Sequence, residues 1–515
     1  MTALANNAVI GVIGAGTMGA GIAQVAAAAG HQVLLYDVQA GAAEKAIAST
    51  TKGLVKLVTR GKYQQAQCDD IVSRLNACTH LADLAPAALI IEVIVENLGI
   101  KQQVFNELEG ICSPATIFAT NTSSISVTSI GATLQKPERL VGMHFFNPAQ
   151  IMKLVEVISG VATAPEIAQT IYDTALAWGK KPVLAKSTPG FIVNRVARPF
   201  YAEGLRVLEE GAADVFTIDT VIRSCAGFRM GPFELMDLIG HDVNYAVTCS
   251  VFDSYFKDPR FLPSLTQQEL VNAGYLGRKS GRGFYRYDQQ APEQSLVVAE
   301  QQIAPKCLVV NGDLGIASPL LAIAEQLGLK VEYRECHSDD ILADSLEVDG
   351  VVIALTQGTT ATQSSFESEH NDLVLFDLSI DYQQSPYLVL TKSDQCSQAA
   401  LNKAIGFFQA LNKAVIIIDD IAGMIAMRTV CMLINEAADT VNQQVCSIEG
   451  VDMAMQYGVN YPQGPLVWAD QIGMAQVVNV LFALEDHYGQ GRYRSSPLLL
   501  RKLYSQQNFY GNKNA

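Results

Sequence analysis

One histidine and one glutamate stand twelve residues apart in an otherwise apolar part of the chain. His144 lies in the segment 141–148 (VGMHFFNP), and Glu156 lies in the segment 152–157 (MKLVEV). A neutral imidazole can accept a proton near neutral pH, and a carboxylate on its other ring nitrogen fixes the tautomer and stabilises the imidazolium. The pair therefore suits removal of a hydroxyl proton during oxidation of a secondary alcohol. The alternative is a hydrogen-bonded core histidine and an exposed strand glutamate.

A glycine-rich turn near the N-terminus separates a predicted strand from a predicted helix. Residues 8–13 (AVIGVI) form a short apolar run, and an Ala-rich stretch follows the turn. In such turns one glycine allows a tight bend, one allows the backbone to approach a pyrophosphate, and one allows close helix–strand packing. The alternative is a purely structural turn. The predicted dinucleotide-binding residues of this turn are Gly14, Gly16, Thr17, Met18 and Gly19.

An acidic residue follows the next predicted strand at the spacing that a dinucleotide fold requires. The strand 32–36 (QVLLY) ends at Asp37, eighteen residues after Gly19. At that place the carboxylate would accept hydrogen bonds from the adenosine ribose. A carboxylate repels a ribose 2'-phosphate, and the next residues, Val38 and Gln39, offer no arginine. We therefore expect NAD rather than NADP.

Strands and helices continue to alternate after this first unit. Apolar runs at 89–95 (LIIEVIV) and 117–120 (IFAT) flank a helical stretch through Phe105 and Leu108. This order predicts an α/β fold with a Rossmann-like, doubly wound and mostly parallel sheet. Ligands bind beyond the carboxyl ends of such strands, so Glu96, Asn97 and residues 121–124 (NTSS) should face the ligand.

The composition narrows the functional classes. A length of 515 residues predicts three or four domains, and 49% hydrophobic with 17% charged residues is typical of a globular protein. The net charge of -15 argues against nucleic acid as a partner. The ten cysteines include no C-x-x-C pair, so no metal site is expected. The first residues carry no basic cluster and no apolar run approaches about eighteen residues. We expect a cytoplasmic protein without a membrane partner.

Five segments together resemble the 3-hydroxyacyl-CoA dehydrogenase family over about the first 290 residues. They are GAGTMG (14–19), NTSS (121–124), HFFNP (144–148), MKLVEV (152–157) and TPGFIVNR (188–195). The resemblance implies NAD-dependent oxidation of an L-3-hydroxyacyl-CoA to the 3-oxoacyl-CoA. It also implies that His144 is the general base with Glu156 as its partner, and that Ser123 and Asn194 hydrogen-bond the substrate oxygens. The residues implied around the nicotinamide half of the cofactor are Glu96, Lys101, Ser123 and Asn147.

A coenzyme A thioester carries several phosphates, so a basic helix face is expected beside the cleft. Lys52, Lys56 and Arg60 recur every four residues, which places them on one helical stripe, and Lys62 follows. Lys56 and Arg60 are the predicted contacts to coenzyme A. A solvated helix face is the equal alternative.

The second half of the chain repeats the first at a constant offset. Gly190 and Gly423 lie 233 residues apart, and the same shift aligns ten identical residues, whereas ordinary composition gives roughly three. The region after 187 is predicted helical, with Asp219 at the start of a helix. The identical residues of the first copy are Gly190, Ile192, Arg195, Glu203, Asp219, Gly231, Pro232, Asp237, Ile239 and Gly240.

The candidate catalytic positions do not survive this shift. His144 aligns with Asp377, and Glu156 aligns with Val389. The strand and turn outline at 308–315 (LVVNGDLG) also lacks two of the three glycines. We therefore expect a degenerate Rossmann-like and helical copy without catalysis, which could mimic a partner subunit as an intramolecular pseudo-dimer; a homodimer is the alternative. The predicted domains are 1–186 (NAD-binding), 187–290 (helical), 291–419 (degenerate Rossmann-like) and 420–515 (second helical), with a linker over 287–304.

The two-copy layout resembles the 3-hydroxyadipyl-CoA dehydrogenases of phenylacetate breakdown. The alternative substrate is 3-hydroxybutyryl-CoA, because no residue clearly binds a distal carboxylate; Arg223 and Arg229 are candidates that could equally be surface charges. A non-catalytic dinucleotide-binding protein would retain the glycines but would not need the base. A dehydrogenase of free hydroxy acids would not need the HFFNP segment. A bifunctional hydratase-dehydrogenase is disfavoured because the repeat accounts for the remaining residues.

Overall fold

The computed structural model describes residues 3–288, 295–334 and 342–511. The chain forms two compact units. The first comprises Met1–Arg195 with Gln443–Val459, and the second comprises Val196–Asn442 with Asn460–Ala515. Part of the predicted linker over 287–304 lies outside the described residues.

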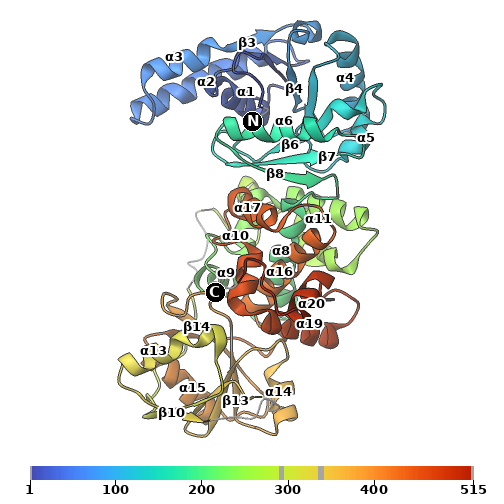
Figure 1. The fold of residues 1–515 in the computed structure, drawn as a ribbon. Coiled ribbons are helices and arrows are strands. Elements are labelled where there is room, and N and C mark those ends of the chain that lie inside the picture. Colours follow the sequence, from blue (N-terminus) through green and yellow to red (C-terminus); the bar gives the residue numbers. More distant parts are fainter. Residues whose placement is uncertain (1–2, 289–294, 335–341, 512–515) are drawn as a thin grey trace. The chain divides into compact units, whose positions relative to one another are not determined.

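The first unit contains a sheet of eight strands within the described residues (Figure 1). Its order is β3-β2-β1-β4-β5-β6-β7-β8, and every pair is parallel except β6 with β7. This is the predicted doubly wound sheet, extended by an antiparallel turn of the chain. The strands are β1 (Ile10–Ile13), β2 (Val33–Tyr36), β3 (Leu75–Cys78), β4 (Leu89–Glu92), β5 (Ile117–Thr120), β6 (Leu140–Phe145), β7 (Leu154–Ser159) and β8 (Lys181–Lys186).

Helices pack on both faces of this sheet because its central strands are apolar on both sides. Ile91 of β4 belongs to the core cluster that includes Ile22 of α1 and Ile171 of α6. On the other face, the rings of Phe105 and Phe118 lie 5.6 Å apart. The helices of this unit are α1 (Thr17–Ala28), α2 (Ala42–Thr59), α3 (Gln65–Ser73), α4 (Leu98–Ile111), α5 (Val127–Gly131), α6 (Pro165–Ala177), α7 (Val193–Val196, at its end) and α17 (Ile448–Val459), with short 3-10 turns η1 (Leu81–Leu84) and η2 (Pro137–Arg139).

Helix α17 comes from the second helical segment of the sequence, yet it packs on β7 and β8 of the first unit. The approach is close, because a Cβ at Gly458 would lie 2.6 Å from a methyl group of Leu154. The residues 443–459 therefore complete the first unit, an exchange that a linear division of the sequence does not show.

The second unit contains a seven-stranded sheet in the part of the chain that is described. Its order is β10-β9-β11-β12-β13-β14-β15, with β11 antiparallel to both neighbours and β13 antiparallel to β14. The sheet is thus a reduced relative of the first one, as predicted. The strands are β9 (Cys307–Asn311), β10 (Lys330–Arg334), β11 (Ser345–Val348), β12 (Val351–Leu355), β13 (Leu373–Phe376), β14 (Tyr387–Lys392) and β15 (Ala414–Ile417).

The offset of 233 residues holds for the strands as well. Strand β7 (Leu154–Ser159) maps onto β14 (Tyr387–Lys392), and α6 (Pro165–Ala177) maps onto α15 (Gln398–Ala410). The antiparallel register is also the same, because Gly142 pairs with Ile158 and the equivalent Leu375 pairs with Thr391.

The remaining helices of the second unit form two related sets. Asp219 does not begin a helix as predicted; it lies inside α9, is fully buried, and accepts hydrogen bonds from the first N–H groups of α10. The helices are α8 (Arg198–Glu209), α9 (Val215–Ser224), α10 (Pro232–Ile239), α11 (His241–Ser254), α12 (Leu265–Asn272), α13 (Pro319–Gln326), α14 (Ala361–Ser368), α15 (Gln398–Ala410), α16 (Ala426–Asn442), α18 (Pro465–Ile472), α19 (Met474–Tyr488) and α20 (Pro497–Tyr504), with 3-10 turns η3 (Pro259–Phe261), η4 (Arg278–Ser280) and η5 (Gly315–Ala317).

The two helical sets pack against each other through equivalent positions. Phe228 and Tyr461, which are 233 residues apart, stack edge to face with ring centroids at 4.8 Å. The Tyr493 hydroxyl donates to Glu203 at 2.9 Å. The equivalent residues of the other copies, Arg260 and Glu436, form an ion pair at 3.0 Å. Contacts between equivalent residues define a local pseudo-twofold axis.

Within the described ranges, none of the helices taken singly has the length and apolar composition to cross a membrane, although the bent pair α18 and α19 passes that test jointly.

Candidate active site

The glycine turn between β1 and α1 has the geometry predicted from its three glycines. Gly14 has a φ of +102°, and a Cβ there would lie 2.4 Å from the carbonyl oxygen of Val93. A Cβ at Gly19 would lie 1.8 Å from the carbonyl oxygen of Gly14, whereas one at Gly16 would meet nothing within 4 Å. Two glycines therefore permit protein packing, and the third leaves the backbone open to a ligand.

The N-terminus of α1 is ready to bind an anion. No side chain caps the helix, so its first N–H groups retain hydrogen-bonding capacity at the open position of Gly16. Thr17, the first helical residue, is exposed, whereas Met18 packs partly into the core. The pyrophosphate of a dinucleotide fits this end of the helix.

Asp37 lies just after β2, next to the glycine turn. Its carboxylate accepts hydrogen bonds from the backbone N–H groups of Ala15 at 2.7 Å and Gln39 at 2.9 Å. This places a negative charge at the strand end where the predicted adenosine ribose would bind.

His144 and Glu156 face each other directly across the antiparallel pair β6 and β7. Nδ1 of His144 lies 2.6 Å from Oε2 of Glu156, and both residues are buried. Phe146 and Phe191 enclose the imidazole, with ring centroids at 4.6 and 5.9 Å. A carboxylate at Nδ1 holds the proton there and leaves Nε2 as the basic nitrogen. The arrangement is that of an oriented general base.

The second oxygen of Glu156 holds the start of α7. Oε1 accepts the N–H groups of Ile192 and Val193, both at 3.0 Å. Phe191 precedes them with a positive φ of 48°, a strained turn for a bulky residue. Glu156 therefore links the base to the helix that carries Asn194.

The second copy retains this cap without the base. Asp377 accepts the N–H groups of Ile425 at 3.0 Å and Ala426 at 2.7 Å, which are the equivalents of the two residues that Glu156 binds. Burial raises the pKa of Asp377 to about 6. Asp377 occupies the position of His144, and Val389 occupies that of Glu156, so the pair is absent at these positions.

Ser123 and Asn194, the predicted substrate contacts, are brought together in the first unit. The Asn194 amide donates to the backbone carbonyl of Ser123 at 3.4 Å. Both side chains are half-buried. They come from the loop after β5 and from α7, so the structure gathers sequence segments about seventy residues apart.

Glu96 orders the loop that contains Ser123. Its carboxylate accepts the hydroxyl of Thr122 at 2.6 Å and the N–H groups of Ser123 and Ser124 at 3.0 and 3.1 Å. Although burial raises the pKa of Glu96, the hydrogen bond from Thr122 and the charge of Lys101 lower it further, below its ordinary value. An ionised Glu96 therefore fixes the backbone of the predicted nicotinamide region.

Lys101 is a buried centre of charge in α4. Its ammonium pairs with Glu92 at 2.7 Å and with Glu96 at 3.2 Å. Glu92, which sequence reasoning missed, also accepts the hydroxyl of Thr120 at 2.7 Å. Lys101 thus orders this site through carboxylates, and the signal for Glu92 was an acidic residue inside the apolar strand β4.

The loop between β6 and β7 carries Asn147, which is exposed and precedes a cis proline. Two further residues that sequence reasoning missed hold this region. The buried ammonium of Lys180 donates to the carbonyl oxygens of Ala149 at 2.5 Å and Met152 at 2.9 Å. Asn121 accepts the N–H of Phe145 at 2.8 Å. Neither residue carried a spacing signal.

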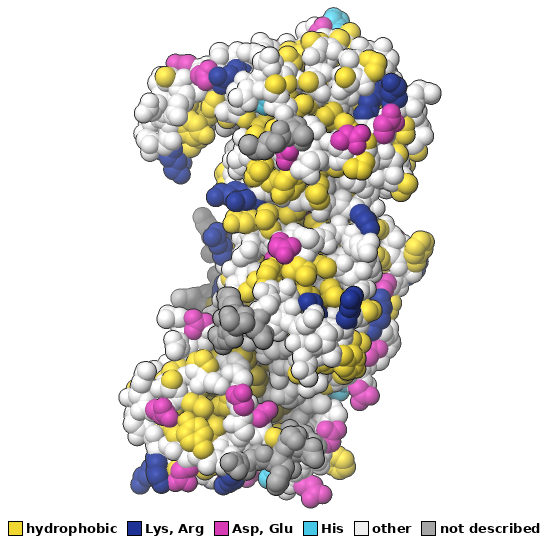
Figure 2. Space-filling model, in the orientation of Figure 1, with side chains coloured by type: hydrophobic (Ala, Val, Ile, Leu, Met, Phe, Trp, Pro, Cys, Tyr) yellow, Lys and Arg dark blue, Asp and Glu magenta, His cyan; other side chains and the backbone are white. Residues whose placement is uncertain are grey.

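A cavity of about 480 Å³ lies between α1 and α2 beside the glycine turn. Lys45, Ser49 and Gly53 of α2 line it. Lys56 and Arg60 follow at helical spacing and are exposed, so they continue the same stripe toward the end of the helix. Figure 2 shows basic side chains at the free end of the arm formed by α2 and α3.

The two arginines considered for a distal carboxylate differ in their surroundings. Arg223 forms an ion pair with Glu234 and also donates to Thr220 at 3.0 Å. Arg229 is exposed. Neither contact singles out a substrate-binding role.

Comparison with protein families gives three matches. A model described as the NAD binding domain of 3-hydroxyacyl-CoA dehydrogenase matches residues 9–188. The C-terminal domain of the same family matches residues 190–287 and again 423–515, which confirms the duplication. A reduced Rossmann-fold domain of 3-hydroxybutyryl-CoA dehydrogenase matches residues 353–421.

Relatives match either the whole chain or its first half. A protein of Escherichia coli strain K12 named 3-hydroxyadipyl-CoA dehydrogenase is 44% identical over 97% of this chain and 98% of its own length. A Clostridioides difficile protein named 3-hydroxybutyryl-CoA dehydrogenase is 41% identical over 54% of this chain and 99% of its own length.

A solved structure covers nearly the whole chain. It is described as 3-hydroxybutyryl-CoA dehydrogenase from Escherichia coli K12, with a TM-score of 0.88, 43% identity and coverage of 97% of this chain and 99% of that one. The NAD-binding model also confirms the predicted cofactor. The chain belongs to the 3-hydroxyacyl-CoA dehydrogenase family of NAD-dependent oxidoreductases.

Proposed function

We propose that this enzyme oxidises L-3-hydroxyadipyl-CoA to 3-oxoadipyl-CoA with formation of NADH, as a step of phenylacetate catabolism. The observation that carries the adipyl assignment is the 44% identity to the Escherichia coli 3-hydroxyadipyl-CoA dehydrogenase over almost the full length of both chains. The alternative substrate is 3-hydroxybutyryl-CoA, because the structural relative of equal coverage bears that name.

His144 would act as the general base. With Nδ1 held by Glu156, Nε2 accepts the proton of the substrate 3-hydroxyl, and the carboxylate at 2.6 Å stabilises the imidazolium that forms. NAD, when bound, supplies the acceptor for the hydride that leaves C3. The burial of the pair strengthens this electrostatic support because little water screens it.

Ser123 and Asn194 would orient the substrate. Their side chains can hydrogen-bond the 3-oxygen and the thioester carbonyl, and Glu96 and Glu156 fix the backbone segments that carry them. The glycine turn and Asp37 would bind the pyrophosphate and adenosine ribose of the cofactor. The basic stripe of α2, with Lys56 and Arg60, would bind phosphates of coenzyme A.

The test of the substrate is parallel turnover. The purified enzyme should oxidise L-3-hydroxyadipyl-CoA with a clearly higher kcat/KM than L-3-hydroxybutyryl-CoA. Equal or better turnover of the butyryl thioester would reject the adipyl assignment and support the alternative.

We further propose that the second helical copy replaces a partner subunit. The support is the contact between equivalent residues, namely Phe228 with Tyr461 and the two glutamates with their partners. An isologous face satisfied inside the chain leaves no need for a second chain at that surface. Light scattering should therefore give the mass of one chain, 55.5 kDa. A mass of two chains would contradict the proposal.

A further inference from the structure

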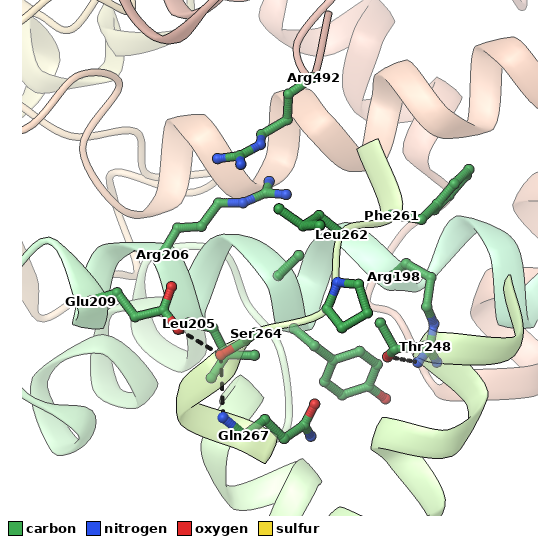
Figure 3. A pocket seen from close by; sticks show the side chains of 13 residues that line it. Arg198, Leu205, Arg206, Glu209, Thr248, Phe261, Leu262, Ser264, Gln267 and Arg492 are labelled. Atoms are coloured by element: carbon green, nitrogen blue, oxygen red, sulfur yellow. Dashed lines mark hydrogen bonds between the residues drawn. The ribbon is translucent and has the colours of Figure 1, made fainter. Parts of the chain in front are cut away.

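Three arginines line a small pocket in the helical part of the second unit (Figure 3). The pocket has a volume of about 80 Å³. Arg198 and Arg206 come from α8 of the first helical copy, and Arg492 follows α19 of the second copy. A cavity of this size holds a few waters or one small anion, but no nucleotide.

Two guanidinium nitrogens at this pocket are buried without an acceptor among the described residues. Arg206 is 8% exposed, and its Nη1 donates to Glu203, whereas its Nη2 has no hydrogen-bond partner. Nε of Arg492 is likewise buried and unpartnered. Buried polar groups are rarely left unpaired in native proteins, so these atoms indicate an acceptor that the chain does not supply.

Positive charge exceeds negative charge at this place. The heads of Arg206 and Arg492 point toward one another in Figure 3. Glu203 cannot neutralise both, because it also accepts Arg428 Nε at 2.7 Å. The other carboxylate in the wall, Glu209, is exposed and accepts the hydroxyl of Ser264 at 2.6 Å. A bound anion would relieve the repulsion between the two guanidinium groups.

The third arginine lies elsewhere in the wall. Arg198 donates to Thr248 at 3.1 Å and stacks over the ring of Tyr201 at 4.9 Å. It adds positive charge to the pocket while its own contacts hold it in place.

The helical packing itself does not require these arginines. Shifting Arg206 by 233 residues gives Asp439, and shifting Arg492 back gives Pro259. The pseudo-equivalent face therefore lacks the basic pair, although the helices pack in the same way. The basic wall is a property of one face only, which favours a binding role over a structural one.

We propose that this pocket binds a carboxylate carried on a short aliphatic stem. Guanidinium groups bind carboxylates with paired charge-assisted hydrogen bonds, and Arg206 Nη2 and Arg492 Nε are donors without a partner. Leu205 and Phe261 provide an apolar wall for the stem. The carboxylate belongs either to a free organic acid or to the distal end of a dicarboxylic acyl thioester. Only the second source rests on the proposed adipyl function.

The first experiment measures the melting temperature of the full chain with adipate and with the uncharged adipamide. Adipate should raise the melting temperature of the wild type and of the control variant Arg501→Gln, in which an exposed arginine of α20 is neutralised. It should not raise that of Arg492→Gln, and Arg492→Lys should recover part of the shift. Equal shifts in wild type and Arg492→Gln, or equal effects of adipate and adipamide, would overturn the proposal.

Kinetics then identify the source of the carboxylate. If it is the distal end of the substrate, Arg492→Gln should lower kcat/KM for L-3-hydroxyadipyl-CoA by roughly 10-fold or more and leave the butyryl thioester unchanged. If it is a free acid, the ratio of the two values stays constant while the adipate shift is lost. The adipyl function itself is judged on the wild type alone, so its failure is distinguishable from failure of the pocket.

Discussion

Replacing Glu156 by Gln should remove the base without removing the histidine. Oε1 of Glu156 accepts two backbone N–H groups at 3.0 Å, so the glutamine must keep its carbonyl oxygen at that position. Its NH2 group is then directed at Nδ1 of His144, which lies 2.6 Å from Oε2 in the native protein. Nδ1 becomes the acceptor, and the ring proton moves to Nε2, which can no longer receive the proton of the substrate.

The expected magnitude follows from losing both the tautomer and the opposing charge. General-base catalysis contributes about 10²- to 10⁴-fold, so kcat should fall within that range. The assay is steady-state NADH formation with L-3-hydroxybutyryl-CoA and L-3-hydroxyadipyl-CoA, with thermal unfolding as the control for an intact fold. The KM for NAD should stay close to that of the wild type. A folded Glu156→Gln enzyme that loses less than about 10-fold in kcat would refute this role of the carboxylate.

The other predictions concern the cofactor turn, the helical interface and pH. Gly16→Ala should keep the wild-type melting temperature because its Cβ meets no atom, yet raise the KM for NAD by roughly 10-fold; Gly19→Ala should instead lower the melting temperature, and the reverse pattern would be inconsistent with the turn geometry. Arg428→Met should cost about 3–5 kcal/mol in urea unfolding, because it leaves the buried Glu203 without one of its partners; a loss below about 1 kcal/mol would contradict this. Burial lowers the pKa of Lys180 to about 8. The folded state then binds fewer protons than the unfolded state between pH 8 and the ordinary lysine pKa of 10.5, so this group makes stability rise with pH in that window. Lys180→Met should lack the rise, and parallel pH profiles of the two proteins would disprove it.

The local motifs were predictable from the sequence because their chemistry dictates their spacing. The strand, glycine turn, helix and Asp37 form one continuous segment, so no distant contact is needed to recognise them. The pairing of His144 with Glu156 was also predictable, since two adjacent strands joined by a short loop place such residues opposite each other. Glu156 proved buried rather than exposed.

The features that were missed depend on contacts between distant residues. Lys180 acts on carbonyl groups about thirty residues earlier, which no pattern of side chains announces. Helix α17 joins the first unit from the far end of the chain, so a linear division could not place it. Asp219 was misread because a buried carboxylate can cap a helix other than its own. Tertiary contacts, not local preference, decided each case.

The most direct test of the central claim is NADH formation from an L-3-hydroxyacyl-CoA by the wild type and by His144→Gln. We expect rapid turnover by the wild type and a loss of about 10²- to 10⁴-fold in kcat in the variant, with binding of NAD retained. Turnover by the variant close to that of the wild type would contradict the assignment of His144 as the base, and absence of turnover by the folded wild type would contradict the dehydrogenase mechanism.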